Sequence, residues 1–469
     1  MNFYLGIDLG TTGTKTILFD ESGNVLGKGY KGYNLITPRD GFFEQNAEDW
    51  YDAVVESTKQ ATADFKGEID GVSFSAQGGS FLFVDVDDSG NIIPLTNAIT
   101  WMDKRAVKEA EELNKTATDF NRVKFGSSSM VTKYLWFKNN APSVYERVKY
   151  VLSTSDYIYM RLTKKAVIDY TSAAMMGVYD PDTDDYSDNM IKLACLKREN
   201  FPKLVGAGAY IADASEEFKA QTGIKGRVAV YAGVHDQFAA SLGANYFDKK
   251  DVIVSTGTTW VVFARNDEKV KGNFAYRKHP AGDYGYFNSA VSSGTVYNWE
   301  RDLFGISYKE MDELASEKEI DENLLVYPFV SGNGSYRGQN VLSFSIKNAN
   351  FKHEKGDIFK ATMEGVSFEI KQIINMYKRN GFEIGKIIVT GGATRSSVWM
   401  GILSDVLGEK LYLSEQADGC CFGAFSVAKK GAVGNFETFE FSGKTVEPNA
   451  KNALKYIDKF DLYNKNLNL

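Results

Sequence analysis

Short apolar runs alternate with longer amphipathic segments along the first part of the chain. The short runs are rich in Val, Ile, Phe and Tyr and are bounded by Gly, Asn or Asp, which is typical of strands. They predict strands over residues 3–7, 16–19, 25–30, 69–75 and 81–85. One amphipathic segment predicts a helix over 47–65 that begins at Asn46 or Ala47 and ends at Gly67. A helical pattern also extends over 104–162, with Trp136 and Phe137 on its apolar face.

The second half of the chain repeats this alternation. Apolar runs predict strands over 251–254, 260–264, 286–289 and 386–390, and helical spacing predicts helices over 358–379 and 397–407. The strand over 386–390 ends directly at Gly391-Gly392. Both halves are therefore expected to mix helices and strands.

A Gly-Thr-Thr turn between two apolar runs occurs twice. Gly10-Thr11-Thr12 joins the runs 4–7 and 17–19, and Gly257-Thr258-Thr259 joins 252–254 and 261–263. A glycine allows close backbone approach, and successive N–H groups with threonine hydroxyls form a concavity suited to phosphate oxygens. Either copy alone is better explained as a simple hairpin turn. The duplication favours two turns that bind one nucleotide.

Length and composition indicate the number of domains and the kinds of partner that the chain can bind. A chain of 469 residues predicts two domains, placed at 1–245 and 246–469 because the second turn follows this boundary. The chain carries 43% hydrophobic and 25% charged residues and a net charge of -7, without a basic stripe, so we expect no nucleic-acid partner. Apolar runs long enough to span a membrane and signal peptides are absent from the sequence, so no membrane association is expected.

Cysteine and histidine usage indicates a reducing cytoplasm and no zinc site. The three cysteines include the neighbours Cys420 and Cys421, which do not form a disulfide framework and are interpreted as small core residues of a helix. The histidines are scattered, and no Cys-x-x-Cys pair is present. Any bound metal is therefore expected to have oxygen ligands.

Two carboxylates stand at positions suited to phosphoryl chemistry. Asp8 ends the first predicted strand, where it could reach a magnesium ion on nucleotide phosphates, and Lys15 could add a positive charge. The alternatives are a turn residue and a solvated lysine. Asp236 begins an Ala-rich helix, where it is either a helix cap or a general base that accepts a proton from a substrate hydroxyl, with Gln237 holding an adjacent hydroxyl.

A third region has the mixture of groups that a polyhydroxylated ligand requires. Gln77 ends a predicted strand, and Trp101-Met102-Asp103-Lys104-Arg105 combines an apolar plate with polar and charged groups. A half-buried tryptophan beside a surface ion pair explains the same residues equally well.

Taken together, these motifs resemble the FGGY family of carbohydrate kinases, in the superfamily of actin, Hsp70 and hexokinase. The resemblance covers nearly the whole chain in the right order. Besides the turns and carboxylates above, it is carried by a Gly-x-x-Glu-Gln-x-x-x-x-Trp segment at 41–50 and a Lys-x-x-Trp helix at 133–136. Further matches are the residues near a nucleotide at 293–299, the end of a family signature at 357–365, an adenosine motif at 391–399 and a terminal helix at 423–424.

The resemblance implies an α/β fold of two RNase H-like, actin-like ATPase domains that flank a central cleft and close on their substrates. It implies ATP and Mg²⁺ as cofactors, ATP on the C-terminal domain and the sugar mainly on the N-terminal one. It implies Asp236 and Asp8 as catalytic and metal-binding residues. The implied nucleotide residues are Gly10, Thr11, Thr12, Thr14, Lys15, Gly257, Thr258, Gly294, Asn298, Gly391, Gly392 and Ser396. The implied substrate residues are Gln77, Gly78, Trp101, Asp103, Asp236 and Gln237.

The sugar itself is less defined by the resemblance. Where similar kinases carry Arg-Glu or Met-His after the glutamine, this chain has Gly78-Gly79, which predicts extra volume in the sugar site. A ketopentose such as xylulose is the favoured substrate, and another polyol, ketose or sugar acid, such as glycerol or gluconate, is the alternative. An ATP-driven conformational switch without an acceptor is a further alternative. The expected partners are a small sugar or polyol and a second copy of the chain in a homodimer.

Overall fold

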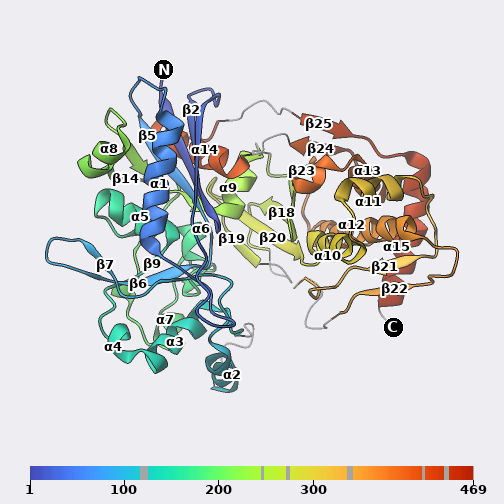
Figure 1. The fold of residues 1–469 in the computed structure, drawn as a ribbon, viewed down its shortest axis with the longest axis horizontal. Helices are drawn as coiled ribbons and strands as arrows, with labels where there is room; N and C mark the ends of the chain where they lie inside the picture. The colour runs from blue at the N-terminus through green and yellow to red at the C-terminus, as the bar shows by residue number, and fades with distance from the viewer. Residues whose placement is uncertain are drawn as a thin grey trace. The chain divides into compact units, whose positions relative to one another are not determined.

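The computed structural model describes residues 1–116, 125–244, 248–270, 275–334, 342–414, 418–437 and 443–467. The chain divides into two compact units. The first unit contains Met1–Gly243, Arg277–Gly282 and Asp418–Phe439, and the second contains Ala244–Tyr276, Asp283–Ala417 and Glu440–Leu469. The domain boundary predicted at 245 lies outside the described residues. Helices and strands occur in both units, so the predicted α/β class is confirmed (Figure 1).

The first unit is built on a mixed sheet with the order β14-β15-β5-β1-β2-β3, and β16 also pairs with β5. β1, β2 and β3 are antiparallel, whereas β5 is parallel to β1 and β15 is parallel to β5. In this register Asp8 lies opposite Lys15 on one side and Ser75 on the other. The strands are β1 (Phe3–Leu9), β2 (Gly13–Asp20), β3 (Val25–Gly32), β5 (Gly71–Ala76), β14 (Tyr210–Asp213), β15 (Ala229–Tyr231) and β16 (Val234–His235).

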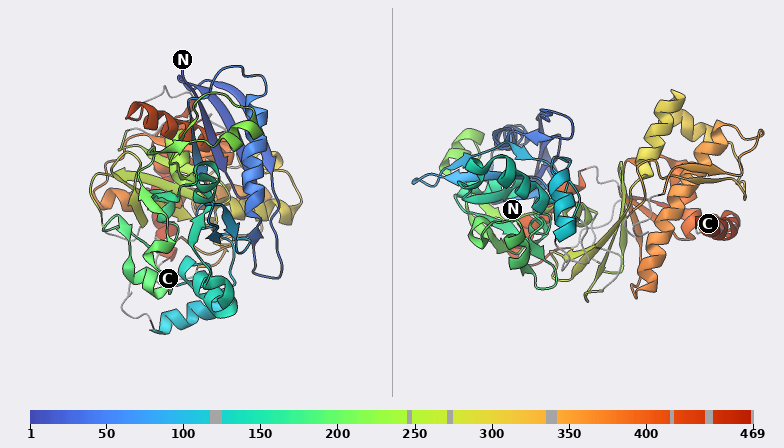
Figure 2. Two further views of the ribbon diagram at one scale, coloured as in Figure 1. Left: turned by 90° about the vertical axis from the view of Figure 1, so that its left-hand side faces the viewer. Right: turned by 90° about the horizontal axis from the view of Figure 1, so that it is seen from below.

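The period-two alternation of β1 separates the two faces of this sheet. Leu5, Ile7 and Leu9 belong to a core that includes side chains of α1 (Ala47–Thr62) and α5 (Thr154–Thr163). Tyr4 instead packs with Phe425 of α14 (Gly419–Val433). Asp8 shares the parity of Tyr4 and therefore faces the side of the sheet that α14 covers. Figure 2 shows α1 running along the blue strands on the opposite face.

A smaller sheet and several short helices complete the first unit. The smaller sheet has the order β4-β8-β6-β7, with β9 paired to β6. Its strands are β4 (Glu44–Gln45), β6 (Phe81–Val86), β7 (Ile92–Pro94), β8 (Ala98–Ile99) and β9 (Tyr150–Ser153). Two-stranded pairs are formed by β10 (Val167–Asp169) with β13 (Lys203–Val205), and β11 (Tyr179–Asp180) with β12 (Asp185–Tyr186). The helices are α2 (Val107–Thr116), α3 (Met130–Asn140), α4 (Pro142–Tyr145), α6 (Tyr170–Ala173), α7 (Asp188–Leu193), α8 (Glu216–Thr222), α9 (Asp236–Gly243) and the 3₁₀ helix η2 (Arg198–Asn200).

The helical prediction over 104–162 is wrong at β9. This strand pairs antiparallel with β6, from Phe81 opposite Ser153 to Val84 opposite Tyr150. Its apolar residues directly precede α5, so the sequence pattern merges the strand with the helix. Pairing with a distant strand, which periodicity does not reveal, decides the local structure.

The second unit repeats the arrangement of the first sheet. Its main sheet contains the order β20-β18-β17-β23-β24-β25, in which β17 and β18 are antiparallel and β17, β23 and β24 are parallel. Its elements are β17 (Val252–Thr256), β18 (Trp260–Asn266), β19 (Ala275–Lys278), β20 (Tyr284–Ala290), β21 (Leu325–Tyr327), β22 (Ser345–Lys347), β23 (Ile387–Gly391), β24 (Leu411–Ser414), β25 (Gly443–Val446), α10 (Ser293–Phe304), α11 (Tyr308–Ser316), α12 (Lys355–Arg379), η4 (Gly392–Arg395), α13 (Ser397–Leu407) and α15 (Ala450–Leu467).

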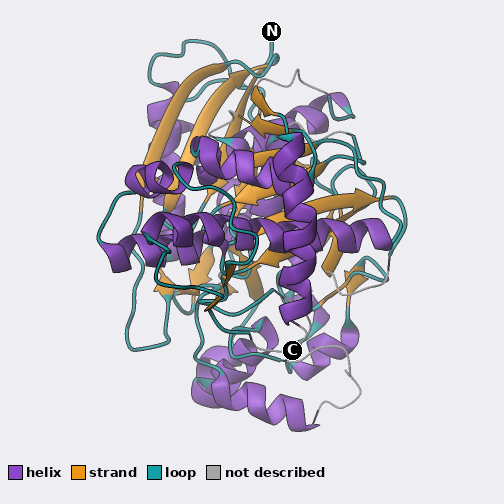
Figure 3. Cartoon of the chain, turned by 90° about the vertical axis from the view of Figure 1, so that its right-hand side faces the viewer, coloured by secondary structure: helices purple, strands orange, loops and turns teal. Residues whose placement is uncertain are grey.

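Helices cover the sheet of the second unit (Figure 3). Val252 and Val254 of β17 and Val389 of β23 belong to one core with side chains of α12, α13 and α15. Within the part of the chain that the structure describes, no helix has the length and apolar character needed to cross a membrane. The three cysteines are free thiols.

One buried carboxyl in this core makes the stability of the second unit pH-dependent. Glu300 of α10 is 1% exposed, and its Oε1 accepts a hydrogen bond of 2.6 Å from the hydroxyl of Thr362 on α12. Oε2 has no hydrogen-bond partner among the described residues. Burial raises the pKa of Glu300 to about 8, so the folded protein holds this side chain as a neutral acid near pH 7.

We predict that Glu300→Gln removes a pH-dependent loss of stability. In the wild type, the raised pKa contributes stability below the ordinary carboxyl pKa, and this contribution is lost as the pH rises from there to about 8. The difference in melting temperature between the variant and the wild type should therefore shift in favour of the variant from pH 5 to pH 8, as measured by calorimetry. Exposed Glu310→Gln is the control, and a difference that does not change with pH would contradict the prediction.

Candidate functional site

The first Gly-Thr-Thr turn joins β1 to β2 and is held by its neighbours. The Gly10 N–H donates to the carbonyl of Gly13 at 3.1 Å, and the Tyr33 N–H donates to the carbonyl of Thr12 at 3.2 Å. The Tyr33 hydroxyl donates to the carbonyl of Gly10. Thr11 accepts from Trp101 Nε1 at 3.2 Å. The turn therefore has a fixed backbone, as a phosphate-binding turn requires.

The second turn joins β17 to β18 and is packed against the beginning of α10. A Cβ atom built on Gly294 would lie 2.2 Å from the carbonyl oxygen of Gly257, so only glycine fits there. The backbone N–H and the hydroxyl of Thr295 both donate to the carbonyl of Thr258, at 2.9 and 3.1 Å. Thr256 Oγ1 donates to Thr390 and accepts from the Ala393 N–H, which ties this turn to the Gly391-Gly392 turn.

Asp8 and Asp236 are brought together in the first unit. Asp8 accepts a hydrogen bond of 2.7 Å from the Ser75 hydroxyl across the β1–β5 pairing. Burial, and to a lesser extent the negative charge of Asp236, raises the pKa of Asp8 to about 6, against the lowering effect of Ser75. Asp236 is the first residue of α9, and its side chain is 34% exposed. These neighbouring carboxylates offer oxygen atoms to a cation or to a proton.

Their chemistry fits a hydrated Mg²⁺ ion. Asp236 Oδ1 is buried and has no hydrogen-bond partner among the described residues. Within the residues that the structure describes, no group of three or more His, Cys, Asp or Glu side chains is placed to hold a metal ion. Mg²⁺ typically takes one or two carboxylates and completes its shell with water and substrate phosphates, so two carboxylates are a sufficient protein contribution.

Gln77 is part of a buried amide network that links the turn at Thr11 to the region around β5. Its Nε2 donates to Gln45 Oε1 at 3.1 Å, and Gln45 Nε2 donates to the carbonyl of Thr11 at 2.6 Å. Gln45 Oε1 also accepts from Trp50 Nε1 at 3.1 Å. The Gln-x-x-x-x-Trp spacing carried the signal for Gln45, which we did not predict as a site residue.

Asp103 is completely buried in an ion pair with Arg105. Its oxygens accept from Arg105 Nε at 2.9 Å, from Arg105 Nη2 at 2.8 Å and from the Phe43 N–H at 2.8 Å. Arg105 Nη2 also donates to Glu44 at 2.6 Å. Trp101 is 49% exposed. Asp103 therefore fixes the loop that carries Trp101, and direct contact of Asp103 with a substrate stays a prediction.

The structure shows what lies beside Gly78, whereas the extra volume predicted for the sugar site stays a prediction. A Cβ atom on Gly78 would lie 2.3 Å from both Nε2 and Cδ2 of His235 and 2.8 Å from Met175. The imidazole of His235 therefore occupies the space that a side chain at residue 78 would enter. Gly79 has a φ of +72° and lies against Trp101. No sequence pattern indicates this contact, because residues 78 and 235 meet only through the pairing of β16 with β5.

The remaining predicted residues of the first unit differ from one another in burial and in their partners. Thr14 is fully buried, whereas Thr12 is exposed. Lys15 Nζ forms an ion pair of 2.8 Å with Asp418, which also pairs with Lys28 at 2.6 Å. Gln237 lies in the first turn of α9, beside Asp236. The proposed nucleotide contacts of Thr12, Thr14 and Lys15 stay predictions.

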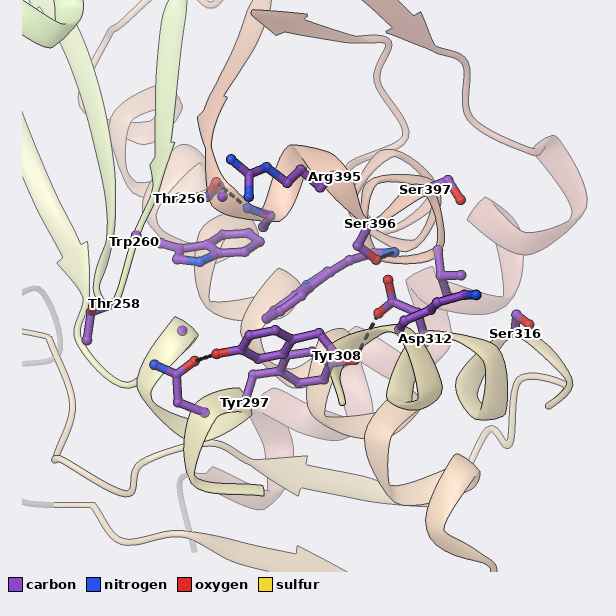
Figure 4. A pocket seen from close by; sticks show the side chains of 18 of the residues that line it. Thr256, Thr258, Trp260, Tyr297, Tyr308, Asp312, Ser316, Arg395, Ser396 and Ser397 are labelled. Carbon is purple, nitrogen blue, oxygen red and sulfur yellow. Dashed lines mark hydrogen bonds between the residues drawn. The ribbon is translucent and has the colours of Figure 1, made fainter. Parts of the chain in front are cut away.

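The predicted nucleotide residues of the second unit gather around one pocket of about 790 Å³ (Figure 4). The volume of the pocket is within the usual range for small-molecule and cofactor sites. Gly391 precedes the lining residue Gly392; it has a φ of +97°, and a Cβ atom on it would lie 2.4 Å from the carbonyl oxygen of Thr256. The predicted residues that line it are Gly257, Thr258, Gly294, Asn298, Gly392 and Ser396.

Aromatic side chains form a wall of this pocket that sequence reasoning missed in part. The rings of Tyr297 and Tyr308 are stacked, with centroids 6.0 Å apart and planes within 10°. Trp399 lies 4.8 Å from both Trp260 and Tyr297. The hydroxyl of Tyr308 donates to Asn298 Oδ1 at 2.5 Å, while the Tyr297 hydroxyl donates to Asp312 at 2.9 Å. Flat apolar surface beside hydrogen-bonding groups suits a nucleoside.

Comparisons with known proteins show which family this chain resembles along its length. Residues 3–243 match the model of the N-terminal domain of the FGGY family of carbohydrate kinases, and residues 252–432 match that of its C-terminal domain. A xylulose kinase of Bacillus subtilis is 25% identical over 99% of this chain and 96% of its own length. A gluconokinase of the same organism is 27% identical over 94% of this chain and 89% of its own length.

Solved structures show the same fold. The crystal structure of a ligand-bound xylulose kinase from Lactobacillus acidophilus superposes with a TM-score of 0.90 at 23% identity, and the match covers 100% of this chain and 98% of that one. The predicted two-domain, actin-like ATPase fold is therefore confirmed.

We predict that Gly294→Ala weakens nucleotide binding. The added methyl group would meet the carbonyl oxygen of Gly257, and the resulting strain of about 1–3 kcal/mol would displace the turn that carries Thr258. The dissociation constant for ATP, measured by calorimetry, should rise about tenfold or more. Gly401→Ala in α13 is the matched control because its new Cβ atom would have no neighbour within 4 Å. Equal ATP affinities of the two variants would contradict the prediction.

Proposed function

This chain belongs to the FGGY family of carbohydrate kinases and is an ATP-dependent sugar kinase, and we propose that it phosphorylates a ketopentose such as xylulose. The observation that carries the mechanism is the proximity of Asp236, a partly exposed carboxylate, to Asp8, whose pKa it helps to raise. The likeness to xylulose kinases over nearly the full chain supports the sugar class.

In the proposed mechanism Asp236 is the general base. Its carboxylate accepts the proton of the acceptor hydroxyl, whose oxygen forms a bond to the γ-phosphorus of ATP. The bond from that phosphorus to the bridging oxygen breaks, and ADP leaves.

Asp8 and Asp236 would hold Mg²⁺ through their carboxylate oxygens, directly or through water. The bound ion supplies positive charge that stabilises the phosphate oxygens. Thr12, Thr258 and the N–H groups of their turns would donate hydrogen bonds to the same phosphates. In the second unit, the aromatic wall and Asn298 would hold the nucleoside of ATP.

The charges around the acceptor residues favour a neutral sugar. Arg105 has a side chain that is 3% exposed and is paired with Asp103 and Glu44. Lys133 is fully buried, donates to the carbonyl of Thr100 at 2.8 Å, and has a pKa that burial lowers to about 8. Both cations are therefore buried and already paired, and neither is exposed to a carboxylate of a substrate.

A sugar acid is the second candidate because a gluconokinase is also among the full-length relatives. An assay of ADP release with purified protein, ATP and Mg²⁺ separates the two candidates. It compares xylulose, ribulose, glycerol and gluconate as acceptors. We predict that a ketopentose gives the highest kcat/KM and that gluconate is at least about tenfold poorer. A preference for gluconate would reject the neutral-sugar assignment, and stimulation by no acceptor would reject all four.

We predict that Asp236→Ala lowers kcat by about 10²–10⁴, the usual contribution of a general base, with the sugar that the wild type prefers. ATP affinity should change little, because the pocket of the second unit does not include this residue. Single-turnover kinetics and calorimetry measure the two effects separately. A variant with near-normal turnover would remove Asp236 from the mechanism.

A further inference from the structure

The imidazole of His235 occupies an unusual place beside the proposed base. His235 ends β16, opposite Ala76 of β5, and is 6% exposed. Its Nε2–Cδ2 edge lies where a side chain of residue 78 would begin, since a Cβ atom on Gly78 would come within 2.3 Å of both atoms. Glycine at 78 is thus a condition for the ring to occupy this position.

The same edge of the ring contacts the carboxylate of Asp236. His235 Nε2 lies 3.1 Å from Asp236 Oδ1. The two atoms are close enough for a hydrogen bond but are not aligned as one, since Oδ1 has no hydrogen-bond partner in the described part of the chain. Because Oδ1 is buried, the 34% exposure of this side chain comes from its other atoms, which include Oδ2.

The backbone that carries the ring is held by hydrogen bonds to two helices. The Gly233 N–H donates to the Tyr159 hydroxyl of α5 at 2.6 Å. The His235 N–H donates to Thr171 Oγ1 of α6 at 2.8 Å, and that hydroxyl donates to Asp169 at 2.5 Å. These contacts fix the backbone from which the ring extends toward the carboxylate.

We propose that His235 is a positioning residue for Asp236: its Nε2 holds the Oδ1 edge of the carboxylate, so that Oδ2 faces the acceptor hydroxyl. The proposal rests on the proposed role of Asp236 as the base. This role requires Nε2 to carry a proton and the carboxylate to rotate until Oδ1 accepts a hydrogen bond from it. Without the ring, the carboxylate could rotate into the space beside Gly78, and fewer bound substrates would meet it in a productive orientation.

The alternative is that His235 only fills space, and two substitutions distinguish these roles. His235→Leu introduces an apolar side chain of similar volume that has no hydrogen-bond donor, whereas His235→Gln keeps an N–H donor. We expect Leu to lower kcat by about ten- to a hundredfold, because misplacement of a reacting group carries a cost of this order. The KM for ATP should be unchanged and the KM for the sugar changed much less than kcat, and Gln should restore most of kcat. Equal kcat for Leu and wild type would overturn the proposal, as would equal losses for Leu and Gln.

A double-mutant cycle with Gly78 tests the position of the ring. Gly78→Ala alone should lower kcat because its Cβ atom displaces the imidazole. In the His235→Ala background, the same substitution should have little further effect, and additive effects would overturn the arrangement.

Asp236→Ala separates the failure of this proposal from that of the proposed function. If Asp236→Ala keeps normal turnover, the base itself is wrong. If it loses turnover while His235→Leu keeps it, the base stands and the positioning role of His235 is rejected.

Discussion

Close backbone packing between the sheet of the first unit and the helices α9 and α14 is the constraint on which the proposed acceptor site depends. A Cβ atom on Gly6 of β1 would lie 2.0 Å from the carbonyl oxygen of Cys421 in α14. The two helices meet in the same way, since a Cβ atom on Gly423 would lie 2.0 Å from the carbonyl oxygen of Ala239, and one on Gly243 would lie 1.8 Å from that of Gly419. Larger residues at these positions would separate α9 from β1, and with it Asp236 from Asp8.

This packing holds two carboxylates close together, where they repel one another and favour the binding of the cation that the proposed reaction requires. Asp8 is partly buried near a second carboxylate, and the neutral Ser75 hydroxyl only partly compensates, so the pKa of Asp8 rises to about 6. Lys15, whose charge also lowers this pKa, is held by Asp418. Two carboxylates in a poorly solvated place favour the binding of a cation. The ATP-dependent transfer proposed above brings such a cation together with the phosphates.

The sequence predicts the elements that repeat and those whose pattern is local. The Gly-Thr-Thr turns, most strands of the two main sheets and the helix α1 were predicted because periodicity and turn residues determine them. The strand β9 could not be predicted, because its pairing with β6 is long-range. Likewise, the contact of His235 with Gly78 joins distant segments, and the stacking of Tyr297 on Tyr308 depends on how the consecutive helices α10 and α11 pack, which periodicity does not reveal. The pairing of Asp8 with Asp236 was implied by family resemblance, whereas sequence spacing alone left both with ordinary alternatives.

The two units share a strand order and a turn, yet their chemistry differs at one equivalent position. Asp8 and Ser255 both stand two residues before the turn glycine, and in each sheet the neighbouring parallel strand places a hydroxyl residue, Ser75 or Thr390, opposite. The second unit therefore has a hydroxyl where the first has a carboxylate. A turn that receives phosphates without a neighbouring anion repels them less, whereas a turn beside Asp8 attracts a cation. In the proposed mechanism, the turn of the second unit therefore contacts the nucleotide phosphates, and the turn of the first unit lies beside the carboxylates that hold the metal ion and accept the proton.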